Sequence, residues 1–194
     1  MIGPNIGVAC LYCDYGSWKE QTPVSMISSL LRQFITGMPE IPEELTEAFR
    51  AAKGHLGGRA LKVEKMIDIF PKVLQHFDRT FICIDALDEF RVGDRAMFLQ
   101  LLKKITDKCP NTRLFLTGRL HIQQELGKQF NRPIVTITVQ PRHDDIKQYL
   151  ATKLDNDFGD GAMDDNLREE IIANIARNDS EMLVFYRFLI FSIH

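Results

Sequence analysis

The chain has 194 residues, of which 45% are hydrophobic and 26% charged, and its formal net charge at pH 7 is −2. This balance is typical of a globular protein that buries one core, or a core with a small appendage. Near-neutral charge gives no electrostatic reason to expect nucleic acid or an anionic membrane as the main partner. The N-terminus lacks a basic segment followed by an apolar one, so we expect no signal peptide and a cytoplasmic location.

Strand-like and helix-like segments alternate along the chain, which predicts an α/β fold with parallel strands. The first strand is expected at residues 6–13. The helix that follows has Thr22 as its N-cap and Pro23 as its first residue, and Gly37 is suited to end it.

The next segments lead to a strongly apolar strand. A second helix is expected from about residue 42 to residue 54, and the glycine-rich residues 54–59 are expected to form a flexible loop. Residues 62–77 have a helical pattern, in which Pro71 must either kink the helix or divide it in two. The apolar strand itself is expected at residues 80–85.

The remaining elements continue the alternation and then become helical. Up to Pro141 we expect a helix, a strand, a short helical segment and a strand, at residues 94–106, 113–117, 121–128 and 133–139. Beyond it we expect a helix, a Gly/Asp-rich loop, a helix and an apolar core helix, at residues 143–154, 155–165, 166–177 and 182–193. The last segment is too short to span a bilayer and contains Arg187. We therefore divide the chain into an α/β core, residues 1–140, and the beginning of a helical subdomain, residues 141–194.

Three carboxylates, Asp85, Asp88 and Glu89, follow the apolar strand. Like charges this close repel one another, and a bound metal ion would remove the conflict. In a nucleotide hydrolase Asp85 would hold magnesium through water, and Asp88 or Glu89 would orient or deprotonate the attacking water. Arg119, just past the next strand, would neutralise charge on a terminal phosphate. The alternative is a solvated loop that caps the helix near Asp94, with Arg119 as a surface charge or as a partner of Asp85.

Four segments occur in an order and at distances that resemble the NACHT domains of STAND-class P-loop NTPases: VACLYCD (8–14), SLLRQ (29–33), IDALDE (84–89) and LTGR (116–119). The resemblance is to the fungal domains that precede ankyrin or WD40 repeats. It implies a three-layer, P-loop NTPase-like parallel sheet followed by the start of an all-helical lid. By position, Asp85 matches the magnesium-associated acid of an extended Walker B motif, and Asp88 and Glu89 match its distal acids. Thr117 and Arg119 match the sensor segment, with Gly118 where the family more often has Ser.

The resemblance also implies a function. Such domains are nucleotide-dependent switches that oligomerise in signalling, often in self/non-self recognition or cell death. Their cofactors are Mg²⁺ and ATP or GTP. Their partners are proteins, either further copies of the domain or molecules recognised by the attached repeats. The resemblance implies no nucleic acid and no membrane span.

The chain departs from this family at the phosphate-binding loop. A P-loop requires G-x-x-x-x-G-K-[ST], and the one Gly-Lys pair here, Gly127-Lys128, is followed by Gln129. The family has its Walker A segment directly upstream of the part that matches residue 6. We therefore expect a module truncated before its P-loop, which binds no nucleotide tightly and is not catalytic alone. The alternatives are an active magnesium-dependent ATP or GTP hydrolase with its P-loop supplied differently, and a non-catalytic protein-interaction scaffold.

The missing segment has a structural consequence. The sheet order that the resemblance implies places the P-loop strand between the strands at residues 113–117 and 133–139. Without it, both neighbours expose backbone ladder groups and apolar surface. Three outcomes are open: another segment supplies the strand, the two neighbours pair directly, or the chain folds poorly.

The four cysteines, Cys10, Cys13, Cys83 and Cys109, do not form a zinc-binding pattern, because no second Cys pair and no suitably spaced His doublet accompanies Cys10 and Cys13. In a strand, Cys10 and Cys13 would lie on opposite faces. We interpret all four as buried structural thiols in a reducing compartment.

Overall fold

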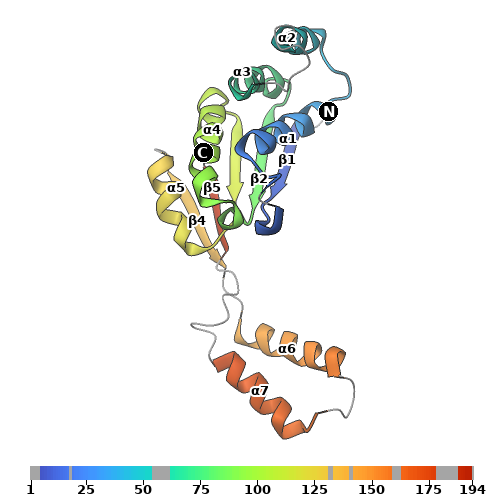
Figure 1. Ribbon diagram of the computed structural model, residues 1–194, viewed down its shortest axis with the longest axis vertical. Helices are drawn as coiled ribbons and strands as arrows, with labels where there is room; N and C mark the ends of the chain where they lie inside the picture. The colour runs from blue at the N-terminus through green and yellow to red at the C-terminus, as the bar shows by residue number, and fades with distance from the viewer. Residues whose placement is uncertain are drawn as a thin grey trace. The chain divides into compact units, whose positions relative to one another are not determined.

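A computed structural model describes residues 5–17, 19–53, 62–130, 133–139, 142–158, 163–177 and 188–193. The chain divides into two compact units, Met1–Ile137 with Leu189–His194, and Thr138–Phe188. The first unit contains a sheet and five helices (Figure 1), which confirms the α/β class predicted from the alternating pattern.

The sheet has five strands in the order β1-β2-β3-β5-β4. Their bounds are Ile6–Tyr12 (β1), Arg79–Asp85 (β2), Thr112–Leu116 (β3), Ile134–Val139 (β4) and Phe188–Ile193 (β5). Strands β1, β2 and β3 are parallel neighbours, as predicted. Consequently β2 and β3 end at the same edge of the sheet, which is where an α/β sheet places its ligands.

Strand β5 corrects the prediction of an apolar core helix at residues 182–193. Residues 188–193 form a strand antiparallel to β3, with Leu114 opposite Ile193 and Leu116 opposite Phe191, whereas residues 182–187 lie outside the described residues. The sequence FLIFSI is rich in aromatic and β-branched residues, which favour strands. Pairing beside β3 also satisfies ladder groups that would otherwise be exposed. The position between β3 and β4 is therefore filled from elsewhere in the same chain, the first of the three outcomes that the sequence left open.

The five helices of the first unit are α1 to α5, at Pro23–Thr36, Glu43–Lys53, Val63–Leu74, Val92–Lys108 and Gln123–Gln129. Short 3-10 turns, η1 to η3, occur at Tyr15–Ser17, Leu87–Glu89 and Leu120–Ile122. Helix α1 begins as predicted, because the Thr22 side chain accepts a hydrogen bond from the Ser25 backbone at 3.2 Å and Pro23 is the first helical residue. Pro71 lies inside α3 without dividing it, although the helix ends at Leu74 rather than at residue 77. The predicted loop at residues 54–59 lies outside the described residues.

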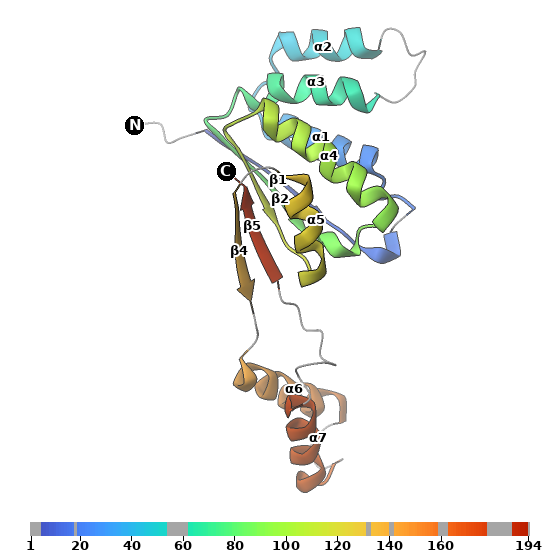
Figure 2. The same cartoon turned by 90° about the vertical axis from the view of Figure 1, so that its left-hand side faces the viewer.

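Helices α1, α3, α4 and α5 lie on one face of the sheet (Figure 2). Alternate strand residues are buried on that face: Ala9, Leu11, Ile82, Ile84, Leu114 and Leu116. On the other face Val8 and Tyr12 of β1 are 53% and 71% exposed, and Val135 and Ile137 of β4 are about half exposed. We call this second surface the helix-free face, since none of the helices α1 to α5 covers it.

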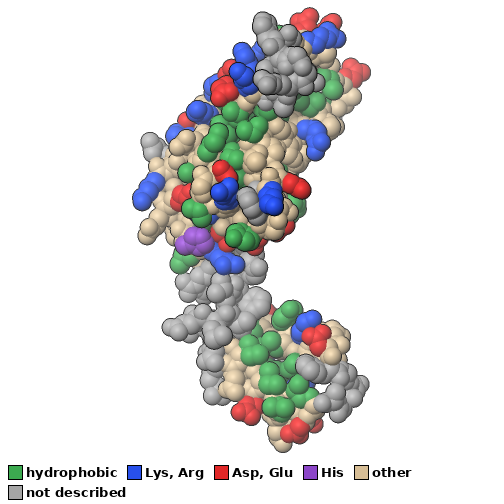
Figure 3. Space-filling model, viewed as in Figure 1, with side chains coloured by type: hydrophobic (Ala, Val, Ile, Leu, Met, Phe, Trp, Pro, Cys, Tyr) green, Lys and Arg blue, Asp and Glu red, His purple; other side chains and the backbone are tan. Residues whose placement is uncertain are grey.

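The second unit contains two helices, α6 (His143–Phe158) and α7 (Asp165–Arg177), close to the bounds predicted for them. Helix α6 runs four residues beyond its predicted end at residue 154, because residues assigned to the Gly/Asp-rich loop continue it. Arg168 of α7 donates to Asp155 of α6 at 2.8 Å and links the pair. Figure 3 shows hydrophobic side chains gathered over these helices. No helix in the described part of the chain has the length and apolar character needed to cross a membrane.

Candidate functional site

The acidic segment begins where β2 ends, and β3 contributes to the same place. The Thr117 hydroxyl donates a hydrogen bond to Oδ1 of Asp85 and accepts one from the Ala86 backbone at 2.9 Å. Backbone bonds join the same segments, from Thr117 N–H to the Ile84 carbonyl and from Leu87 N–H to the Thr117 carbonyl, each 2.9 Å long. These bonds hold the ends of β2 and β3 together. The other carboxylate oxygen, Oδ2 of Asp85, accepts no hydrogen bond from a described residue.

Ala86 turns the chain sharply between the strand and the acids that follow. Its φ of 52° and ψ of 44° lie in the left-handed region, and it is the one non-glycine residue with positive φ in the described part of the chain. This conformation costs an L-residue roughly 1–2 kcal/mol. The hydrogen bonds from Ala86 and Leu87 to Thr117 hold the turn in place. The strained turn therefore costs folding free energy but directs the next residues back toward β3.

Asp88 lies in this turn and is bound by Arg119. Its Oδ2 is 3.1 Å from Nε of Arg119, and its Oδ1 accepts the Arg119 backbone N–H at 3.2 Å. The Asp88 side chain is only 8% exposed, whereas that of Arg119 is 44% exposed. Charge-assisted bonds to a nearly buried carboxylate are the strong kind. The sequence analysis considered Arg119 as a partner of Asp85, and the structure pairs it with Asp88 instead.

Gly118 packs closely against Asp88 and Ile122. A Cβ atom at this position would lie 2.5 Å from Cδ1 of Ile122 and 3.2 Å from Oδ1 of Asp88. The first distance is too short for any side chain without movement of Ile122. A larger residue at this position would require the Ile122 side chain to move, so glycine suits the close packing of Asp88 and η3.

Arg95 is a component of the site that sequence reasoning missed. Its guanidinium, with a side chain 6% exposed, donates to Glu125 at 2.8 Å and to the carbonyl oxygens of Asp88 and Phe90 at 3.2 and 3.3 Å. It therefore fastens the acidic turn to α4 and α5. The signal was present, since Arg95 precedes the buried Phe98 by three positions and so shares the apolar face of its helix.

Glu89 points toward the turn that follows β1 and not toward Arg119. Its Oε2 accepts the Tyr15 backbone N–H at 3.4 Å. In the same turn, a hydrogen bond from the Gly16 backbone and a second one from the Ser17 hydroxyl lower the pKa of Asp14. Three predicted acids thus have three separate partners: Thr117 for Asp85, Arg119 for Asp88, and Tyr15 for Glu89.

The negative potential of these acids reaches the buried thiol of Cys13. Burial and, to a smaller extent, the charges of Asp85, Asp88 and Glu89 together raise its pKa to about 12, against an opposing effect of Arg95. The Cys13 backbone also donates to the Asp85 carbonyl at 3.0 Å. This thiol is a neutral core group, as the sequence analysis expected, and it is no candidate nucleophile.

The described residues contain no group of three or more His, Cys, Asp or Glu side chains placed to hold a metal ion. A preformed calcium or zinc cage would need such a group. Magnesium is different, because it keeps several waters and is held by one or two carboxylates together with substrate phosphates. The residues present fit that mode, with the unengaged Oδ2 of Asp85 as the carboxylate oxygen that would face a hydrated ion.

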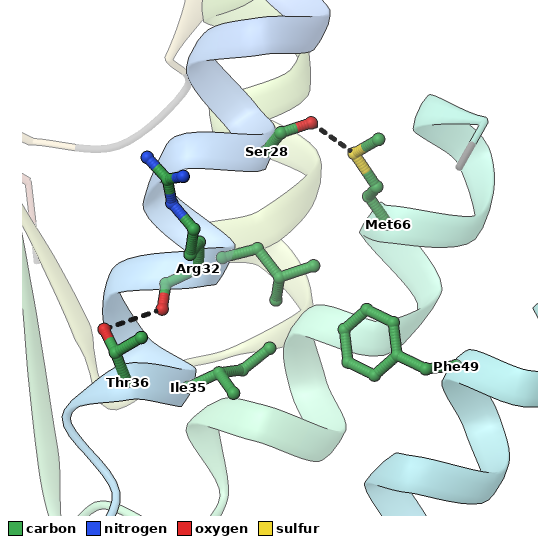
Figure 4. A pocket seen from close by; sticks show the side chains of 7 residues that line it. Ser28, Arg32, Ile35, Thr36, Phe49 and Met66 are labelled. Atoms are coloured by element: carbon green, nitrogen blue, oxygen red, sulfur yellow. Dashed lines mark hydrogen bonds between the residues drawn. The ribbon is translucent and has the colours of Figure 1, made fainter. Parts of the chain in front are cut away.

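A pocket of about 300 Å³ lies elsewhere in the unit, between α1, α2 and α3 (Figure 4). Leu31, Ile35 and Phe49 give it an apolar wall, and Ser28 donates to the Met66 sulfur at 3.2 Å on one side. None of the three acids or their partners lines this pocket. We therefore place the candidate site at the ends of β2 and β3.

Comparison with models of protein families shows which family part of the chain matches. Residues 3–119 match the model of the family described as nephrocystin 3, N-terminal. This range is more than half of the chain, and it includes β1, β2, β3 and all three acids with their partners. Comparisons with curated proteins and with solved structures found no match.

Proposed function

The chain belongs to the nephrocystin 3 N-terminal family, and we propose that it is a NACHT-like signalling module, related to nucleotide-dependent switches, that binds no nucleotide tightly by itself. In this proposal Asp85, Asp88 and Glu89 are a Walker B type of acidic cluster, and Thr117 and Arg119 are the matching sensor segment. Mg²⁺ and ATP or GTP are the ligands to which such a cluster responds. We further propose that the 194-residue chain alone does not hydrolyse nucleotide.

The observation that carries the proposal is the joining of Asp85 to Thr117. The two residues come from the carboxyl ends of neighbouring parallel strands and were predicted to act at one site. The Thr117 hydroxyl fixes Oδ1, so that Oδ2 is held in one orientation. A carboxylate oriented at this edge is suited to a hydrated cation beside phosphates. Its hydrogen-bonded neighbours limit the reorganisation needed when a cation arrives.

The same geometry supports the absence of catalysis by the chain alone. Arg119, which would have to stabilise charge on a terminal phosphate, is already neutralised by Asp88 at 3.1 Å. Both carboxylate oxygens of Asp88 are in turn bonded to Arg119, so neither is free to orient an attacking water. Phosphoryl transfer depends almost entirely on positioning and charge stabilisation. Because Arg119 and Asp88 are bound to each other, Arg119 cannot stabilise phosphate charge and Asp88 cannot orient a water until a ligand separates them.

Phosphate release from Mg-ATP and Mg-GTP tests this proposal. We expect the purified chain to release phosphate at the rate of buffer, and the Asp88→Ala/Glu89→Ala double variant to do the same. Release above background that disappears in the double variant would identify an active hydrolase with an unconventional phosphate site. Equal phosphate release by the unaltered chain and the double variant would indicate a contaminating enzyme. The two proteins are then purified again and their release rates compared once more.

A protein-interaction role is the second candidate, and the helix-free face favours it. Its exposed apolar side chains include Val8 and Tyr12 on the edge strand β1 and Val135 and Ile137 on the opposite edge strand β4, and exposed apolar surface can mark contact sites. The partner that we propose is a protein, such as a further copy of the chain. Light scattering that finds only monomer over a wide concentration range would count against self-association.

A further inference from the structure

Two cysteine side chains lie side by side on the helix-free face. Cys10 of β1 and Cys83 of β2 are register partners on neighbouring parallel strands, so their side chains project beside each other from the same face of the sheet. Both are free and partly exposed, whereas Cys13 and Cys109 are buried. The interpretation of all four as buried structural thiols is therefore wrong for Cys10 and Cys83, because their strand positions face away from α1 and α4.

The spacing of the strands argues against a disulfide at this pair. Neighbouring strands lie about 4.8 Å apart, so Cβ atoms of in-register residues are separated by about that distance. A disulfide needs Cβ atoms about 3.8 Å apart. Closing the bond would draw β1 and β2 together locally, against seven register pairs that hold them parallel. Oxidation of this pair is thus opposed by the sheet itself.

An ion placed between the two sulfurs fits the same spacing better. A metal–thiolate bond is about 2.3 Å long, so a linear sulfur–metal–sulfur unit spans about 4.6 Å. That span is close to the distance between the strands, and it requires no shift of the backbone. On this face the thiols are flanked along the two strands by Val8 and Phe81 on one side and by Tyr12 and Asp85 on the other.

The number of ligands selects the ion. Zinc takes four protein ligands in structural sites and three in catalytic ones. In the described part of the chain no third His, Cys, Asp or Glu joins this pair to make such a group. Soft thiolate ligands select Cu⁺. We propose that Cys10 and Cys83 form a two-thiolate binding site for Cu⁺ on the helix-free face of the sheet. Each thiol gives up its proton as its sulfur binds the ion, and no electron is transferred.

Competition with a chromogenic Cu⁺ chelator under anaerobic, reducing conditions tests the site. The whole chain is expected to withdraw one equivalent of Cu⁺ from the chelator. Cys10→Ser and Cys83→Ser should each weaken binding by more than about tenfold, since a single thiolate cannot complete linear coordination. The control is Cys13→Ala/Cys109→Ala, which removes two thiols elsewhere and should bind as the unaltered chain does. Circular dichroism establishes that each variant is folded.

Three results would overturn the proposal. The chelator retains all of its Cu⁺, or Cys83→Ser binds as tightly as the unaltered chain, or the Cys13→Ala/Cys109→Ala control loses the ion. A second measurement tests the spacing argument without any metal. After incubation with oxidised glutathione, mass spectrometry is expected to find no bond between Cys10 and Cys83. Ready formation of that disulfide would show that the strands approach more closely than the linear site requires.

Discussion

Replacing Arg95 with methionine is expected to lower the free energy of unfolding by about 3 kcal/mol, because a nearly buried guanidinium holds three acceptors at once. The variant leaves Glu125 without its partner at 2.8 Å and the carbonyl oxygens of Asp88 and Phe90 without donors. Methionine keeps much of the side-chain volume, so the loss reports the polar contacts and not a cavity. Urea unfolding, followed by circular dichroism, measures the difference.

Lys103 on the same helix offers a matched control. It pairs with Asp107 at the same distance, 2.8 Å, but the two side chains are 30% and 44% exposed. Exposed pairs contribute no more than about 1 kcal/mol, so Lys103→Met should change stability little. Equal losses in the two variants would show that Arg95 has no special part in holding the acidic turn.

Placing proline at Ser192 is expected to cost about 3 kcal/mol or more, because β5 lies inside the sheet. Ser192 is the register partner of Phe115, and a strand with a neighbour on each side uses every backbone N–H in a ladder bond. Proline at this position removes one backbone donor, whether that N–H donates to β3 or to β4. Losing β5 would also expose the edges of β3 and β4, so we expect aggregation on mild heating.

Ser192→Thr is the control for this substitution. It keeps the backbone N–H and introduces a residue that favours strands. The threonine variant should unfold at the same urea concentration as the unaltered chain or slightly above it. If the proline and threonine variants unfold together, β5 is not a part of the stable sheet.

Local chemistry made much of the fold predictable. The start of α1 was predicted to the residue, since Thr22 and Pro23 act on their immediate neighbours. Strand β2 was predicted within one residue from its apolar run. In contrast, a short apolar segment does not distinguish a strand from a buried helix by its periodicity. For residues 188–193 the decision depended on the vacant position beside β3, which is distant in sequence.

The candidate site, like the fold, could be predicted from the sequence only in part. The sequence indicated that the residues following β2 and β3 act together, because the ends of adjacent parallel strands meet at one edge. It could not show that Arg119 binds Asp88 rather than Asp85, because the left-handed turn at Ala86 decides which acid faces η3. The sequence places Arg95 on the apolar face of its helix, but it could not show which groups Arg95 binds, because its three bonds join segments up to thirty residues apart.

Calorimetric titration of the 194-residue chain with Mg-ATP measures most directly whether the acidic cluster holds a nucleotide unaided. We predict no heat beyond dilution, which corresponds to a dissociation constant weaker than about 1 mM. Asp85→Ala and Asp85→Asn, the second of which keeps an oxygen to accept from Thr117, should behave identically in this titration. Micromolar affinity in the unaltered chain that Asp85→Ala abolishes would contradict the prediction.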